Sequence, residues 1–274
     1  MKEIFREFLG FGGGYLREPE GYLSWQHILF VSCLMATMVA TAILLAHHFK
    51  HKEDKSKNKV LIGAAIAIDT LEITKIVIFC IRGNDPMGWL YELPLFLCSI
   101  QLITIPLAAF AKGRIKESAL DFVMIFGILG AVLGTIGAGQ NYGCYPVLSL
   151  DNVVSGLTHS ISGFSSLYIM FVGLASMKRK NIGITFSILG FFCVAAYAAN
   201  HILDYNYMFL MRGDGTPYDI LYNLVSGSKI IYPLSVVALF VAYISVFYLV
   251  YYMKSKKHEL SEATQQGDPH NAVV

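Results

Sequence analysis

Apolar residues occur in blocks of about 20 along almost the whole chain, separated by short charged loops. A block of this length can cross a bilayer as a helix, whereas strands of membrane barrels alternate polar and apolar positions over about ten residues. No such alternation occurs, so the pattern predicts an all-α, polytopic membrane protein with a seven-helix transmembrane bundle. The predicted spans are Trp25–Ala46, Val60–Ile81, Tyr91–Phe110, Ala119–Gly139, Val153–Met177, Ile182–Leu203 and Lys229–Met253.

The composition supports this class. Of 274 residues, 55% are hydrophobic and only 15% are charged, where soluble domains carry about a quarter. The mean hydropathy is +0.55. These values exclude a soluble enzyme, a disordered chain and a secreted disulfide scaffold. The net charge of +2 is uninformative as a total.

The distribution of basic residues predicts the orientation. Fourteen of the 21 lysines and arginines fall in loops 47–59, 111–118 and 178–180 and in the C-terminal tail. Cytoplasmic loops carry such an excess, so the N-terminus is predicted outside and the C-terminus in the cytoplasm, in the inner (plasma) membrane. We expect an extracytoplasmic segment at 1–24, with a short interfacial helix and no cleavable signal, a transmembrane domain at 25–253 and a disordered tail at 254–274.

Charged residues inside the second span are the strongest departure from apolarity. Asp69, Glu72 and Lys75 follow each other at intervals of three, so they share one helix face and must avoid lipid. Two interpretations stay open at this point. One is an internal Glu72–Lys75 ion pair that stabilises the bundle, and the other is a polar cavity that binds a head group or carries a proton.

Further polar residues gather at the predicted outer ends of other spans and predict a polar pocket open toward the outer leaflet. They are Glu92, Cys98, Ser99, Gln101, Thr158, His159, Ser160, Asn200, His201, Asp204, Asn206, Tyr207 and His27. The fourth span instead carries small residues at helical spacing, which favours close packing in the centre of the bundle. These are Gly127, Gly130, Gly134 and Gly137.

Cys98 and His159 are the candidate catalytic pair. A thiol becomes a strong nucleophile when a neighbouring imidazole accepts its proton, and such a pair can attack a lipid ester. Metal-assisted hydrolysis is disfavoured because the chain resembles seven-helix zinc hydrolases poorly: their HxxxH-type pair on the last helix has no counterpart in Lys229–Met253, and we predict no metal site. Cys80 and Cys144 both lie near the outer face, so a disulfide between them stays open.

Three segments resemble the YwaF family of bacterial integral membrane proteins, which is related to the animal transmembrane protein 164 acyltransferases. They are LPLFLCSIQL (93–102), LTHSISGFSSLYIM (157–170) and NHILDYNYMFL (200–210), and the similarity extends from about Trp25 to about Tyr251. The resemblance implies transfer of a fatty acyl chain between phospholipids, with Cys98 as the cysteine of the LPLxLC motif and His159 as its partner.

The sequence therefore predicts a lipid acyltransferase or acyl hydrolase that acts on membrane phospholipids, needs no cofactor and binds no nucleic acid. Two alternatives stay open: a transporter of a polar solute or ion that uses Asp69, Glu72 and Lys75, and a non-enzymatic scaffold or sensor. The predicted substrate-binding residues are Glu72, Lys75, Arg82, Asn200, His201, Asp204 and Asn206.

Overall fold

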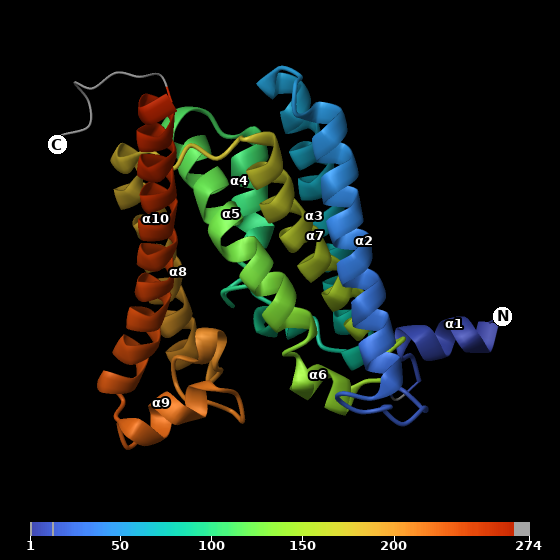
Figure 1. Ribbon diagram of the computed structural model, residues 1–274. Helices are drawn as coiled ribbons and strands as arrows, with labels where there is room; N and C mark the ends of the chain where they lie inside the picture. The colour runs from blue at the N-terminus through green and yellow to red at the C-terminus, as the bar shows by residue number, and fades with distance from the viewer. Residues whose placement is uncertain (1, 13, 266–274) are drawn as a thin grey trace. The chain divides into compact units, whose positions relative to one another are not determined.

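The computed structural model describes residues 2–12 and 14–265, and these form helices and connecting loops without a strand. The chain divides into two compact units, one ending at Met208 and the other beginning at Phe209 (Figure 1). The first unit contains α1 Lys2–Leu9, α2 Trp25–Phe49, α3 Asp54–Gly83, η1 Gly88–Tyr91, α4 Gln101–Phe110, α5 Gly113–Thr135, α6 Gly139–Cys144, α7 Leu150–Val172, η2 Arg179–Asn181 and α8 Ile182–Leu203.

The second unit is a helical hairpin. The short turn η3 Tyr207–Phe209 leads into it, α9 Tyr218–Leu224 follows, and α10 Ile231–Gln265 is the long helix. Aromatic side chains join the two arms, because Tyr218 packs edge-on against Phe240 and Tyr222 against Tyr232. α10 continues beyond Met253 into the segment expected to be a tail, and positions 266–274 of that tail lie outside the described residues.

α5 and α7 form the centre of the first unit. In the most apolar 18-residue stretch of the segment that contains α5, 67% is buried inside the protein, against 17% for the corresponding stretch of α2. Other helices therefore surround α5. Its small residues allow the close approach that the sequence predicts: the α carbon of Gly127 faces the backbone carbonyl of Ser162, and the Ser166 hydroxyl donates to the Met124 carbonyl at 2.6 Å.

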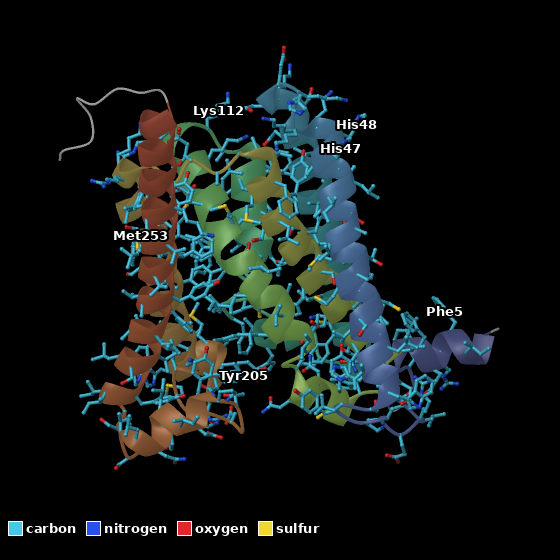
Figure 2. All side chains as sticks on the ribbon, in the orientation of Figure 1. Phe5, His47, His48, Lys112, Tyr205 and Met253 are labelled. Atoms are coloured by element: carbon cyan, nitrogen blue, oxygen red, sulfur yellow. The ribbon has the colours of Figure 1, made fainter. Side chains whose placement is uncertain are left out.

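The remaining helices pack around this pair. α2 and α3 both contact α7, α4 lies against α3 and α5, and α8 packs on α5. Three basic loops meet at one end of the unit, where the Lys116 ammonium donates to the Asn58 side chain at 2.7 Å and Lys178 pairs with Glu117 at 2.5 Å. Figure 2 shows His47, His48 and Lys112 at this end, which we call the basic end.

By length and hydropathy, four segments of the described chain can cross a membrane: Trp25–Phe49, Gly113–Cys144, Arg179–Leu203 and Ile231–Lys254. The protein is thus an all-helical membrane protein. One predicted span is wrong as drawn. Tyr91–Phe110 is not a continuous helix, because only Gln101–Phe110 is α-helical and residues 92–100 are irregular.

Candidate functional site

The irregular segment 92–100 carries Cys98. Proline restricts the residue before it and cannot donate a helical hydrogen bond, so Pro94 disfavours a helix here. The Ser99 side chain then satisfies the backbone locally, because it accepts from the Phe96 amide at 3.0 Å and donates to the Phe96 carbonyl at 3.1 Å. Non-helical backbone at membrane depth is tolerated only where protein or a water-filled cavity covers it.

An aromatic clamp covers this segment from the α8 side. The Tyr207 hydroxyl donates to the Leu90 carbonyl at 2.5 Å, and its ring packs edge-on against Phe96 with centroids 5.2 Å apart. The Tyr205 ring packs in a tilted arrangement against Tyr207, with centroids 4.7 Å apart, and against Tyr91, with centroids 5.6 Å apart. The NHILDYNYMFL and LPLFLCSIQL segments, distant in sequence, therefore meet in space.

Cys98 and His159 face neighbouring turns of the same α5 surface. A Cβ built on Gly130 would lie 3.5 Å from the Cys98 Cβ, and one built on Gly134 would overlap the His159 ring. Residues four apart on a helix lie on one face, about 6 Å from each other. Both side chains are half-buried, and no hydrogen bond joins them within the described part of the chain.

A buried ion triad lies beside this pair. The Lys75 ammonium is 2.7 Å from a Glu72 carboxylate oxygen and 3.0 Å from one of Glu92, so a single cation neutralises one of two acids. The charges of this triad lie near both Cys98 and His159. The internal ion pair that the sequence left open thus exists and has a third member. Asp69 is half-buried one turn away.

Asn200 has a structural partner. Its side chain accepts from the Tyr207 amide at 2.6 Å and donates to the Tyr207 carbonyl at 3.0 Å, which closes the turn after α8. Asp204 caps α8 in the left-handed conformation (φ 50°) and is exposed. His201 is exposed and packs edge-on against Tyr197, while Asn206 is buried.

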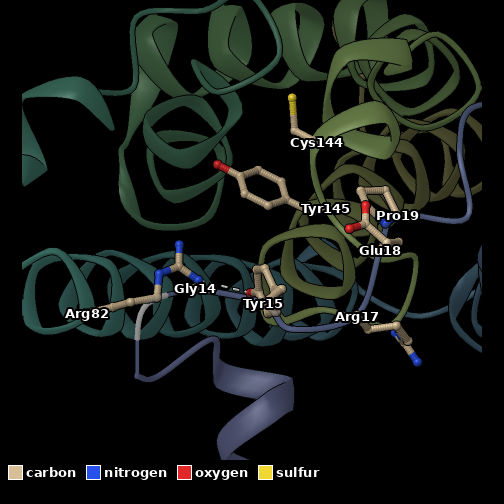
Figure 3. A pocket seen from close by; sticks show the side chains of 8 residues that line it. All are labelled: Gly14, Tyr15, Arg17, Glu18, Pro19, Arg82, Cys144 and Tyr145. Carbon is tan, nitrogen blue, oxygen red and sulfur yellow. Dashed lines mark hydrogen bonds between the residues drawn. The ribbon is translucent and has the colours of Figure 1, made fainter.

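Arg82 is engaged by protein groups. It forms two hydrogen bonds with the Asp151 carboxylate, at 2.7 and 3.2 Å, and one with the Tyr15 hydroxyl at 3.0 Å. The Tyr15 hydroxyl also donates to Asp151 at 2.5 Å. Burial, together with this bond to the carboxylate, raises the pKa of Tyr15 to about 12. The same network borders a cavity of about 340 Å³ between the N-terminal segment and Tyr145 (Figure 3).

That cavity is a polar pocket at the end opposite the basic loops, and its lining differs from the predicted one. Gly14, Tyr15, Arg17, Glu18, Pro19, Arg82, Cys144 and Tyr145 line it. Of the predicted site residues only Arg82 borders it, so the Cys98–His159 pair and Arg82 belong to different places in the fold. Burial raises the pKa of Tyr145, and the nearby Asp151 carboxylate adds to this effect.

Other candidate chemistry does not come together. Within the described residues no three His, Cys, Asp or Glu side chains converge as a metal site requires. His27, which shares the expected depth of His159, is buried against Tyr142 with centroids 4.0 Å apart and contacts the Thr135 carbonyl at 3.3 Å. All five cysteines, Cys80 and Cys144 included, are free thiols.

The structure gives roles to residues that were not among the predicted catalytic and substrate-binding residues, although Glu92 and Tyr207 were expected in the polar pocket. Glu92 completes the triad, Gly130 and Gly134 provide the surface under the candidate pair, and Tyr207 holds the Cys98 segment. The glycine spacing was a usable signal, because an i, i+4 pair on a central helix marks a place of close approach. The Lys75–Glu92 contact joins separate elements and leaves no such pattern.

Comparison with known proteins gives one match. A model of the TMEM164 family matches residues 22–251, which is most of the chain. No curated protein and no solved structure matches. The matched range includes the irregular segment, the triad and the aromatic clamp.

Proposed function

The chain belongs to the TMEM164 family, and on that premise we propose that it is an integral membrane lipid acyltransferase or acyl hydrolase with Cys98 as its nucleophile. The observation that carries the proposal is the shared α5 surface, on which Cys98 and His159 occupy adjacent turns. The predicted relationship to transmembrane protein 164 is confirmed by the family match, while the YwaF name for the bacterial branch stays a prediction.

In the first half-reaction the Cys98 sulfur attacks the carbonyl carbon of a phospholipid fatty ester, and His159 accepts the thiol proton. The tetrahedral intermediate collapses, the ester C–O bond breaks, and His159 returns the proton to the departing glycerol oxygen. The products are a Cys98 thioester and a lysophospholipid.

In the second half-reaction an acceptor hydroxyl, from a lysolipid or from water, gives its proton to His159 and attacks the thioester carbonyl. The C–S bond breaks and the thiolate regains its proton from the imidazolium. Because every proton passes through one histidine, neither half-reaction needs a cofactor. No pre-formed hydrogen bond between the two side chains is required, since such bonds often tighten only when substrate is bound.

The surroundings support these roles. The backbone amides of Cys98 and Ser99 point toward the thiol, where they can stabilise negative charge that develops on the sulfur. The aromatic clamp fixes the irregular backbone, so these groups are held before substrate arrives.

We also propose seven membrane crossings, the third made by the irregular segment 92–100 together with α4 and not by one continuous helix. The basic end then lies in the cytoplasm of the plasma membrane and the Cys98–His159 pair in the outer half. α3 and α7 have 30 and 23 residues, or about 45 and 34 Å, enough to cross a bilayer despite their polar side chains. Their polar residues face protein, as the burial of Glu72 and Ser166 illustrates.

The test is an acyl-exchange assay in detergent–phospholipid mixed micelles, followed by mass spectrometry of the lipids. Cys98→Ala and His159→Ala are each expected to lose at least about 100-fold in rate. Cys33→Ser, which removes an exposed thiol elsewhere, is the matched control and is expected to retain full activity. Full exchange activity in folded Cys98→Ala would refute the proposal.

Transport is the second candidate, favoured by one observation: two carboxylates share one cation inside the membrane protein. It predicts solute or proton flux in proteoliposomes that Lys75→Met abolishes and Cys98→Ala leaves unchanged. The two candidates therefore differ in the effect of Cys98→Ala, which abolishes acyl exchange in the first and leaves transport unchanged in the second.

A further inference from the structure

An apolar groove near the basic end lies outside the candidate catalytic site. α2 and α3 each pack against α7 and hardly contact one another, which leaves a furrow between them whose floor is α7. Its volume is about 550 Å³, within the range of pockets that hold a whole ligand. The furrow is lined by Thr41, Leu45, Phe49, Lys59, Val60, Gly63, Ala64, Ala67, Ile161 and Phe164.

The lining follows one face of each helix. Thr41, Leu45 and Phe49 are four residues apart and form a stripe on α2, about 12 Å long. On α3 the lining residues Gly63, Ala64 and Ala67 are small, and a Cβ built on Gly63 meets nothing within 4 Å. A groove with apolar walls on α2 and small residues on α3 fits a flexible hydrocarbon chain.

Cations lie at one mouth of the groove. Lys59 lines the groove, is exposed and forms no ion pair within the described residues. The Lys52 ammonium lies 4.8 Å from the centroid of the Phe49 ring, which is itself a wall of the groove. The connecting segment 47–59 holds five lysines against two acidic residues, of which Asp54 alone has an ion-pair partner in the described part of the chain, Lys57 at 3.2 Å.

We propose that this groove binds one anionic phospholipid, with an acyl chain between α2 and α3 and its phosphate at Lys59. Basic pockets between membrane helices bind anionic head groups, and each lysine near the phosphate strengthens binding about fivefold. A neutral lipid satisfies the apolar walls equally well but leaves the surplus positive charge unmatched. The charge at the mouth thus selects the lipid class.

This site is independent of the proposed acyl transfer, because none of its lining residues belongs to the Cys98–His159 surface. It requires only that the chain is a membrane protein. An occupant here would bridge α2 and α3, whose mutual contact is otherwise slight, so we expect it to raise the thermal unfolding midpoint.

Native mass spectrometry of the full-length protein in detergent tests the proposal, with dioleoyl phosphatidylglycerol and dioleoyl phosphatidylcholine titrated separately. Wild type is expected to retain one phosphatidylglycerol with at least about fivefold higher affinity than phosphatidylcholine. Lys59→Gln is expected to remove this preference without changing phosphatidylcholine binding. Lys112→Gln, an exposed lysine at the same end, is the matched control and keeps the preference.

Gly63→Phe fills the groove and is expected to abolish the single tight site. Gly63 is exposed, a Cβ at this position meets nothing within 4 Å, and phenylalanine is better accommodated in a helix than glycine, so the fold is expected to tolerate the substitution. Gly190→Phe places the same ring in open space on α8 and leaves lipid binding unchanged. Equal affinity of wild type for the two lipids, or undiminished phosphatidylglycerol binding by folded Gly63→Phe, would overturn the proposal.

Discussion

The α5 surface makes a sharp prediction for Gly134→Ala. A methyl group at this position would overlap three atoms of the His159 ring, whereas ordinary contact begins at 3.4 Å. The ring must retreat by about 1 Å, a displacement that costs about 100-fold in rate when it occurs at a catalytic group. We therefore expect Gly134→Ala to reduce acyl exchange by about two orders of magnitude.

Stability should respond much less than activity. Alanine is favoured over glycine within a helix by about 1 kcal/mol, and this gain offsets part of the roughly 1–3 kcal/mol cost of overpacking. The net change in the free energy of unfolding is then between about 0 and 2 kcal/mol of destabilisation. The protein remains folded while the histidine is displaced.

Gly130→Ala is the matched control one turn away. Its Cβ would meet the Cys98 Cβ at 3.5 Å, which is normal van der Waals contact, so nothing has to move. We expect unchanged exchange and a slightly higher thermal unfolding midpoint. Both variants are measured for acyl exchange and thermal unfolding in the same detergent. Equal activity of Gly134→Ala and Gly130→Ala would refute a catalytic role for His159 in its observed position.

Three further perturbations test the surrounding structure. Asn200→Ala removes both hydrogen bonds to the Tyr207 backbone and is expected to destabilise the protein by about 1–3 kcal/mol, measured by thermal unfolding; an unchanged midpoint would contradict the clamp. Lys75→Met leaves two uncompensated carboxylates and is expected to cost about 3–5 kcal/mol, so a variant as stable as wild type would refute the triad. Between pH 10 and about 12 the Tyr15 hydroxyl ionises in the unfolded chain but not in the folded one, so stability falls as pH rises; Tyr15→Phe is expected to remove this part of the pH dependence, and an identical pH profile would contradict it.

Hydropathy and the spacing of small residues predicted the general architecture, because they depend directly on whether a helix face meets lipid, water or another helix. Two glycines of the fourth span, Gly127 and Gly134, lie in close contact with α7, as the spacing of small residues indicated. Hydropathy did not predict the irregular backbone around Cys98, because the apolar run continues through it. The Ser99–Phe96 hydrogen bonds and the Tyr207 clamp, which stabilise the irregular backbone, depend on contacts that hydropathy does not register.

The predicted substrate-binding residues separate by geometry. Asn200 and His201 are adjacent in sequence but about 100° apart on a helix, so one is buried and the other exposed. Both residues are polar and were therefore predicted to bind substrate, although the helical period places them on different faces of α8. Arg82 pairs with Asp151, which is 69 positions away. Asp151 lies outside the spans predicted from the sequence, so nothing in the hydropathy pattern marked it as a site residue.

The most direct test of the proposed nucleophile is the intact mass of the purified protein after incubation with a mixed phospholipid extract. Wild type is expected to gain the mass of one fatty acyl group, removable by hydroxylamine as a thioester is. Cys98→Ser and His159→Ala are expected to lack this adduct, and Cys33→Ser to form it. A hydroxylamine-sensitive adduct that persists in Cys98→Ser would contradict the assignment of Cys98 as the acyl-accepting residue.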